Sequence, residues 1–324
     1  MTWYAPQKIE EALNETKDFL TPFNMGLWTS LAVLVLLMGG GLGSFNPPTG
    51  GTSPGSSGAT FSDADIASTA PSFTADMHQG FDLGNMATGA FSASAGVDAA
   101  IIAVVAVVAI VFTVLAMLAK FSYFQAVMEK KVGIRRLFSE NLTNALQFIG
   151  LSFLILILAA LPLFPAVAIA GSSQVLAAVF IAALVIYWVV LALALTFVND
   201  FGIPLMIKND VNVIEAARRS LGLAMAEKGQ AAIYFITKVA IGIALGILGL
   251  VASLVVILAL LIPFGILGLL AYLVAPVAGL AVAAIGLLVF FVINLYVRVP
   301  IETYKHYFYV LNLEEFEEDE FVER

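Results

Sequence analysis

Long apolar runs alternate with short polar segments along most of this chain. A helix needs about 20 apolar residues to cross the hydrocarbon of a bilayer, and most of the runs reach that length. The pattern therefore predicts an all-α integral membrane protein with about six transmembrane helices. The predicted spans are residues 27–43, 97–119, 146–170, 175–198, 239–262 and 277–297.

The first run, 27–43, is short enough that a secretory signal peptide is an alternative to a span. The segment before it carries Lys8 and Lys17 among four acidic residues, whereas a signal peptide begins with a basic region. This difference favours a first transmembrane helix.

The last run, 266–297, is too long for one untilted crossing. A turn is predicted at 262–265, and Pro276 is expected to separate a short approach segment from the final span. The pattern leaves open whether 266–298 is one bent helix or two segments.

The spans divide the chain into five regions. Residues 1–26 are predicted to form a cytoplasmic amphipathic helix, 27–43 the first span, 44–96 an extracytoplasmic loop, 97–298 a five-span membrane domain, and 299–324 a cytoplasmic interfacial segment with an acidic tail. The apolar face of the N-terminal helix is predicted at Ile9, Ala12, Leu13, Thr16 and Leu20.

Two polar regions have compositions that disfavour a packed core. The loop at 44–96 is rich in Gly, Ser, Thr, Ala and Pro and contains no Lys or Arg, so a low-complexity segment is expected. Phenylalanines spaced through it leave open that parts fold back onto the membrane domain or a partner. The acidic tail at 314–320 is expected to be solvated and disordered, or to dock on a basic partner.

The basic residues predict the orientation of the chain. All 15 Lys and Arg residues lie in four segments on one side of the predicted bilayer, 1–26, 120–145, 199–238 and 298–324. Lys and Arg concentrate in the cytoplasmic loops of membrane proteins. Both termini are therefore predicted to be cytoplasmic, and the protein to lie in the cell membrane.

Two of these segments are amphipathic connectors between spans. The first is predicted to present one face made of Ile134, Leu137, Phe138, Asn141, Leu142, Ala145 and Leu146. In the second, Asp210 is predicted to cap a helix whose apolar face carries Val213, Ile214, Ala217, Leu221 and Met225.

Basic side chains flank both faces and are candidate contacts for anionic lipid headgroups, where each charge contributes about 1 kcal/mol. These candidates are Lys130, Lys131, Arg135, Arg136, Arg218 and Arg219. The alternative is that they only set the topology and anchor the surface.

An internal repeat is also suggested, because 97–170 and 175–262 both read span, basic connector, span. The Arg-Arg pairs within 134–138 and 217–221 occupy comparable places in the two halves. Within the second half, Gly242, Gly246 and Gly249 form a stripe of small residues that would let another helix approach closely.

Composition excludes several kinds of chemistry. Apolar residues make up 61% of the chain and charged residues 12%, against about 25% charged in soluble domains. The absence of cysteine excludes disulfides, thiolate catalysis and cysteine metal sites. His78 and His306 fall on opposite sides of the predicted bilayer, so they cannot share a metal.

No catalytic or nucleotide-binding motif is present in the sequence. We therefore expect no catalytic residues, no cofactor, no bound metal and no enzymatic activity. The net charge of −8 argues against nucleic acid as a partner. Membrane lipids and a protein partner, or a second copy of the chain, are the expected partners.

No charged or histidine side chain lies near the midpoint of a predicted span, which disfavours ion-coupled transport. Ser152, Tyr187, Ser253 and Asn294 are the polar residues that could line a path, although such residues more often pack helices together.

The order of features resembles an uncharacterised family of multi-pass membrane proteins in haloarchaea. The features are the start Met1 to Ala5, the acidic surface helix, the segment 19–23, a tryptophan-led first span ending in glycines, the outer loop and the aromatic segment 304–313. The connector 204–229, with Glu-Ala-Ala-Arg-Arg-Ser at 215–220, is similar to the membrane domain attached to some glycerophosphodiester phosphodiesterases. Neither resemblance supplies catalytic residues.

The sequence thus predicts a polytopic membrane protein that acts as a non-catalytic scaffold or accessory subunit of a membrane assembly. The alternative is a channel or transporter for a neutral or lipid-like solute. A water-filled polar lining between spans would favour the alternative, and a packed bundle with an exposed glycine stripe would favour the scaffold.

Overall fold

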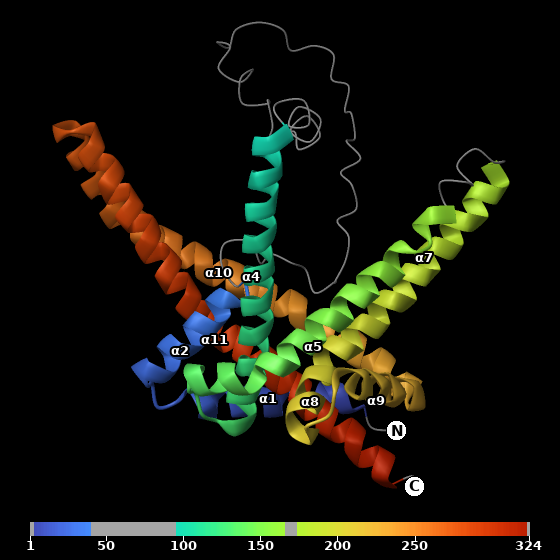
Figure 1. Cartoon of the computed structure of the whole chain (residues 1–324). Helices are drawn as coiled ribbons and strands as arrows, with labels where there is room; N and C mark the ends of the chain where they lie inside the picture. Colours follow the sequence, from blue (N-terminus) through green and yellow to red (C-terminus); the bar gives the residue numbers. More distant parts are fainter. Residues whose placement is uncertain (1–2, 40–94, 166–173, 323–324) are drawn as a thin grey trace, which may run out of the picture. The chain divides into compact units, whose positions relative to one another are not determined.

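The computed structural model describes residues 3–39, 95–165 and 174–322, and every regular element in these ranges is a helix (Figure 1). The all-α prediction is confirmed for this part of the chain. Nearly all of the loop predicted at 44–96 lies outside the described residues.

The elements are α1 (Tyr4–Leu20), α2 (Met25–Leu37), α4 (Ala95–Glu129), α5 (Ile134–Ala160), α7 (Gln174–Phe197), the π-helix η1 (Val198–Gly202), α8 (Ile203–Asn209), α9 (Val213–Ala226), α10 (Lys228–Val274) and α11 (Pro276–Val322).

The chain divides into two compact units, Gly51–Thr113 on the one hand and Met1–Gly50 with Val114–Arg324 on the other. In the first of these, the described residues form the N-terminal half of α4. Its side chains from Ile101 onward are exposed and almost entirely apolar, as in a helix that faces lipid. The larger unit contains the contacts between helices that form the core of the protein.

Five of the described helical segments are long and apolar enough to cross a membrane. They are Ile101–Glu129, Ile134–Pro165, Val175–Asn209, Lys228–Val274 and Pro276–Glu318. Five candidate spans are therefore supported, and the predicted total of about six is not confirmed.

The difference arises at the first predicted span. Asn24 starts α2 there by accepting hydrogen bonds from the amides of Gly26 (3.0 Å) and Leu27 (3.4 Å), and Gly39 follows the helix with a φ of +87°. The helix has only 13 residues. At about 1.5 Å per residue this is roughly 20 Å, less than the ~30 Å of hydrocarbon in a bilayer.

The largest buried side chains do not lie along the apolar middles of the spans. None of the residues in the most apolar windows of α7 and α10 is buried. The buried side chains instead gather where the ends of α4 and α10 and the middle of α11 meet η1, α8, α2 and the start of α5, and we call them the aromatic core. Its largest fully buried members are Tyr123, Tyr234, Phe121, Phe124, Phe201, Phe308, Leu31, Leu34, Leu137, Ile203, Leu205 and Met206.

Helix α1 packs against the C-terminal half of α11. The ring of Tyr4 lies 6.3 Å from that of Phe316, and the ring of Phe19 lies 6.1 Å from that of Tyr307, both edge to face. Of the predicted apolar face of α1, Ile9 and Leu13 are exposed. The face in contact with α11 is rotated towards Ala5, Ala12, Thr16, Phe19 and Leu20, which are buried.

The acidic tail is helical as far as the described residues extend, so the prediction of disorder is wrong for 314–318. Glu315 pairs with Lys8 at 3.0 Å, and Glu317 pairs with Lys208 at 2.8 Å. Burial lowers the pKa of the Lys8 ammonium, but its hydrogen bonds to Glu11 and Glu315 and their charges outweigh burial and hold that pKa above 10.5.

The chain reverses direction later than the sequence predicts. Helix α10 continues through Pro263, so the turn predicted at 262–265 is wrong. The reversal occurs at Ala275, whose extended backbone (φ −156°, ψ 127°) is the conformation that the following Pro276 favours. The region 266–298 is therefore the end of α10 and the start of α11, which run side by side (Figure 1).

Two glycines of α11 allow this close approach. A Cβ atom at Gly279 would lie 2.6 Å from the Cβ of Tyr272, and one at Gly286 would lie 2.9 Å from the ring of Phe264. A larger residue at either position would force α10 and α11 apart.

The internal repeat is not confirmed. Arg135 and Arg136 lie in the first turn of α5, which continues directly into a candidate span. Arg218 and Arg219 lie instead within α9, a separate helix of 14 residues that ends before α10 begins. The two Arg-Arg pairs therefore occupy different local structures.

Candidate functional site

The first group of predicted lipid contacts lies at the turn between α4 and α5. Lys130 follows α4 with a φ of +53°, a left-handed conformation that residues other than glycine adopt only at some expense in free energy. Its ammonium pairs with Glu15 of α1 at 2.6 Å. Lys130 therefore joins α1 to the turn, and its charge is already compensated.

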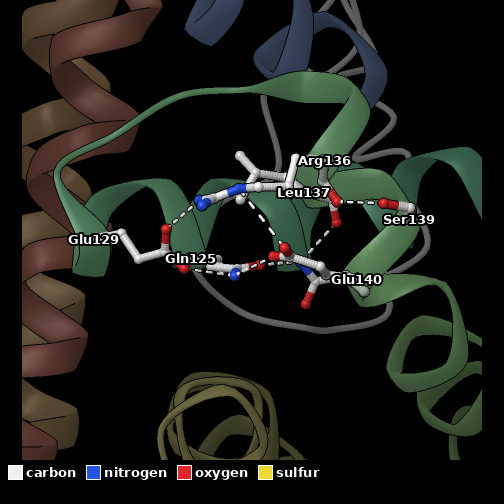
Figure 2. Close-up of polar contacts among 7 residues, drawn as sticks. Gln125, Glu129, Arg136, Leu137, Ser139 and Glu140 are labelled. Atoms are coloured by element: carbon white, nitrogen blue, oxygen red, sulfur yellow. Dashed lines mark hydrogen bonds and ion pairs between the residues drawn. The ribbon is translucent and has the colours of Figure 1, made fainter.

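Arg136 belongs to a polar network that closes the same turn, and Figure 2 shows its members. The guanidinium pairs with Glu129 at the end of α4 and lies 3.7 Å from Glu140 of α5. The amide of Gln125 donates to the same two carboxylates, at 2.6 and 2.8 Å. Two carboxylates thus share one guanidinium and one amide, and we call this network, with Asn141, the turn clamp.

The inner half of the turn clamp is buried. Asn141, only 3% exposed, donates to the side-chain oxygen of Gln125 and to the carbonyl of Leu137, the latter at 2.8 Å. Since a buried amide without partners is costly, these bonds hold Asn141 on the buried face of α5 where the sequence places it. The predicted face is otherwise rotated, because Leu142 and Leu146 are exposed.

The second group lies on α9. Its cap is Asn212, which accepts from the amide of Glu215 at 2.9 Å, whereas the predicted cap Asp210 ends α8 with a φ of +48°. Arg219 pairs with Glu215 at 2.7 Å, one turn apart. Arg218 is exposed.

The side of α9 that packs on the protein differs from the predicted apolar face. Ala216, Ser220 and Leu223 are buried, because this side packs on η1, α5 and α8. Ile214 and Met225 are instead 73% and 69% exposed. They share the exposed side of α9 with Arg218, which is the arrangement of a helix lying in a membrane interface.

The six predicted contacts therefore separate into two classes. Lys130, Arg136 and Arg219 are paired with acidic residues. Of the six, Lys131, Arg135 and Arg218 are exposed and make no ion pair with the described residues, although Lys131 lies within electrostatic range of Glu129. These three can offer charge to a headgroup.

The glycine stripe of α10 is only partly open. A Cβ atom at Gly249 would lie 3.4 Å from Ile301 of α11, whereas one at Gly246 would have nothing within 4 Å. Gly242 is half-buried. Gly246 therefore makes no close contact with the described residues, and the tightest approaches in that part of the chain are at Gly279 and Gly286 of α11.

A buried ion pair lies where the ends of α7 and α10 meet. Asp200, 5% exposed, accepts from the hydroxyl of Tyr234 at 2.8 Å and from the ammonium of Lys238 at 2.5 Å, both through Oδ2. The Lys238 ammonium also lies 5.2 Å from the centre of the Tyr309 ring, a cation–π distance. Asp200 sits in η1, and single π-helical turns are common at functional sites.

A second lysine reaches the same π-helical turn from α4. Lys120 donates to the amide oxygen of Asn199 at 3.5 Å, and the nitrogen of that amide donates to the carbonyl of Leu195 at 3.0 Å. We refer to Lys120, Asn199, Asp200, Tyr234 and Lys238 as the Asp200 cluster. Two ammonium groups and one carboxylate thus meet at the edge of the aromatic core.

The hydrophobic pattern did not predict this cluster. It places Lys120, Asp200 and Lys238 only in the segments beyond the ends of the predicted spans. The available signal was that the apolar runs 97–119, 175–198 and 239–262 each end beside one of these polar residues. The periodicity could not show that the three ends meet.

Aromatic side chains surround the Asp200 cluster. The ring of Tyr234 lies 4.9 Å from that of Phe201 and 5.9 Å from that of Phe308, with which it is stacked. On the α4 side, the Tyr123 hydroxyl bonds to Thr303 at 2.8 Å. These contacts fix the cluster between α4, α10 and α11.

The four polar residues considered for a path all have partners within the protein. Ser152 donates to a carbonyl one turn earlier at 2.9 Å, and Tyr187 donates to a carbonyl of α5 at 2.7 Å. Asn294 donates to Ser253 at 2.8 Å, which joins α11 to α10. Their hydrogen bonds are those of residues that pack helices together.

The described residues contain no group of three or more His, Cys, Asp or Glu side chains that could hold a metal ion. His306 is buried, donates through Nδ1 to the carbonyl of Glu302 at 2.7 Å, and packs on the rings of Tyr123 and Phe124. His78 lies outside the described residues.

The sequence matches one protein family over residues 3–320, and the description of that family is "Family of unknown function (DUF7544)". No curated protein and no solved structure matches the chain. The match gives no link to haloarchaea or to glycerophosphodiester phosphodiesterases, so those two resemblances remain predictions. Because the match covers almost the whole chain, the protein belongs to this family of unknown function.

Proposed function

We propose that this member of a family without an assigned function is a non-catalytic membrane scaffold or accessory subunit. The observation that carries the proposal is the position of the aromatic core. The chain packs against itself near one end of its spans, while none of the residues in the most apolar windows of α7 and α10 is buried by its own chain. Such spans offer their surfaces to lipid or to partner helices.

The partner is a second copy of this chain or another membrane protein. Gly246 supports a helix partner, because it is exposed on α10 and has no neighbour where a Cβ would lie. Without a hydrophobic drive between helices in lipid, small residues promote association by allowing close backbone contact. Gly242 and Gly249 extend the same stripe.

The protein lies in the cell membrane with both termini in the cytoplasm. The segregation of the basic residues supports this orientation. The packing of α1 on α11 is consistent with it, because it brings the N-terminal helix and the C-terminal segment to the same end.

Anionic lipid headgroups bind at this end, at the exposed Lys131, Arg135 and Arg218. The apolar neighbours of Arg218 on the exposed side of α9, Ile214 and Met225, support an interfacial position. Lys130, Arg136 and Arg219 contribute less, because acidic side chains already neutralise them.

Transport of a neutral or lipid-like solute has less support, because the candidate polar residues of the spans bond to their own protein. The scaffold and the transporter differ in whether water reaches the polar residues between the spans. The chain has no cysteine, so single cysteines can replace Ser152 and Ser253, with exposed Ser139 as the positive control. Each variant is treated with a membrane-impermeant, water-soluble thiol reagent from both sides of sealed vesicles.

If the protein is a scaffold, the cysteine at position 139 should react with the reagent, and the cysteines at positions 152 and 253 should not. Reaction at 152 or 253 at a rate near that of the control would mean that water enters between the spans. That result would contradict the scaffold and support the transporter.

A further inference from the structure

The Asp200 cluster contains more positive than negative charge. Lys120 and Lys238 meet a single carboxylate, and Lys238 makes the close contact with it at 2.5 Å. The next acid within electrostatic range of Lys120 is Glu302, which pairs with Lys305 at 2.8 Å. One ammonium therefore lacks a full counter-charge in a partly buried place, where an unpaired charge is costly.

The ammonium of Lys120 also has donors to spare. An ammonium has three donors, and in the described part of the chain Lys120 uses one, at 3.5 Å, the outer limit for a hydrogen bond. Asn199, its acceptor, is fixed by its own bond to Leu195. The π-helical turn thus positions the Lys120 ammonium but does not provide acceptors for all three of its donors.

From the predicted ends of the spans, we expect the cluster at the depth of the lipid phosphate groups. Lys120, Asn199 and Lys238 each stand next to the end of a predicted span, and their convergence places the cluster at the boundary between hydrocarbon and headgroups. Lysine binds phosphate as a point charge, and polybasic sites near the membrane surface attract anionic lipids.

From these observations we propose that Lys120 binds one phosphate-bearing anion, with Lys238 adding positive charge and Asn199 holding Lys120 in place. The donors of the site are the ammonium groups of Lys120 on α4 and Lys238 on α10, both held by acceptors on η1, so the site takes one anion rather than a diffuse layer of lipid. It depends neither on the scaffold function nor on the exposed arginines of α5 and α9.

The test uses the full-length protein in detergent after its bound lipid has been removed. Inorganic phosphate and a short-chain phosphatidylglycerol are the two probes, and a short-chain phosphatidylcholine, which is zwitterionic with no net charge, is the comparison. Native mass spectrometry counts the molecules bound. Lys120→Gln removes the proposed donor. Lys208→Gln is the matched control, because Lys208 lies on α8 just beyond η1 and pairs with Glu317.

We expect the unaltered protein to bind one molecule of probe, and Lys120→Gln to weaken this binding about tenfold or more, as the loss of a charged hydrogen bond implies. Lys208→Gln should bind as the unaltered protein does. Binding of phosphatidylglycerol alone would identify a lipid headgroup as the source of the anion, and binding of both probes would identify the phosphate group itself.

No binding of either probe, or equal binding by the two variants, overturns the proposal. If Lys120→Gln does not fold, the unaltered protein decides the question through its thermal midpoint. A bound anion must raise that midpoint with increasing probe concentration, and high salt must reduce the rise. A midpoint that either probe leaves unchanged would also overturn the proposal.

Discussion

The side chains of Asp200 and Lys238 meet at 2.5 Å, although 38 positions separate them along the chain. The carboxylate oxygen that receives Lys238 also receives the hydroxyl of Tyr234, which lies one turn earlier on α10. Asp200 thus holds α10 at two successive turns. The end of α7 and the start of α10 are fixed to each other through this one residue.

Replacing Asp200 by asparagine keeps the shape of the side chain and removes its charge. We expect Asp200→Asn to lower the free energy of unfolding by about 3–5 kcal/mol, because it leaves buried lysines without their counter-charge. The measurement is chemical unfolding in detergent. Adding Lys238→Met to Asp200→Asn should recover part of the loss.

The control for this prediction is Glu215→Gln, which breaks the exposed pair with Arg219 and should cost about 1 kcal/mol or less. An Asp200→Asn variant as stable as Glu215→Gln would show that the buried pair does not hold α7 and α10 together.

In the turn clamp, the side chain of Gln125 should contribute more to the free energy of unfolding than the side chain of Arg136. Gln125→Leu removes the donor to two carboxylates and the acceptor for Asn141, so we expect a loss of about 1–3 kcal/mol. Arg136→Gln should cost about 1 kcal/mol or less, because its pairs are exposed and screened by salt. Unfolding of both variants at low and high salt measures the difference, and a larger loss for Arg136→Gln would reverse this ranking.

The exposed arginines should account for lipid retention at the cytoplasmic end. Two double variants separate these arginines from the paired ones. One carries Arg135→Gln and Arg218→Gln, and the other carries Arg136→Gln and Arg219→Gln, so that both variants lose the same charge. Native mass spectrometry at low and high salt should show less anionic lipid on the first, since each exposed charge contributes about 1 kcal/mol near anionic lipid. Unaltered retention in both variants would mean that these arginines serve only to orient the chain.

Orientation can be tested by labelling single cysteines in intact cells. Cysteines at positions 56 and 173 should react with an impermeant reagent from outside, and cysteines at positions 139 and 226 should not. Ala226 is exposed, whereas Ser220 on the same helix is buried and would not report on either side. Outside labelling at 139 or 226 would contradict the assignment of both termini to the cytoplasm.

The class of the fold was predictable because apolar runs of membrane length leave few alternatives to helices. Helix ends were less predictable. Pro263, with Gly265 two positions later, resembled a turn. Helix α10 nevertheless continues through it, since a proline in a membrane helix can be accommodated when nearby groups satisfy the freed carbonyl. The residue before Pro276 reverses the chain instead.

Helix faces were predicted from hydrophobicity, and this failed where a polar or small side chain is buried. On α9 the side towards η1 buries the small residues Ala216 and Ser220 as well as Leu223, whereas the larger Ile214 is exposed. The Asp200 cluster could not be predicted for a related reason. Its members are ordinary span-end residues by sequence, and only the packing of α4, η1 and α10 brings them together.

The central claim is that the spans remain available for a partner, and Gly246 tests it most directly. A Cβ atom at Gly246 would have no described residue within 4 Å, so Gly246→Leu should be tolerated, whereas Gly286→Leu meets the ring of Phe264 and should destabilise the fold by about 1–3 kcal/mol through overpacking. Comparing these two variants therefore distinguishes an effect on assembly from an effect on folding.

The measurement is the mass of the particle extracted from membranes in polymer-bounded discs, together with its thermal midpoint. The scaffold predicts a protein mass above the 34.4 kDa of one chain, which Gly246→Leu lowers while the midpoint of the chain stays unchanged. A single-chain mass for the unaltered protein, or an identical mass for Gly246→Leu, would contradict it.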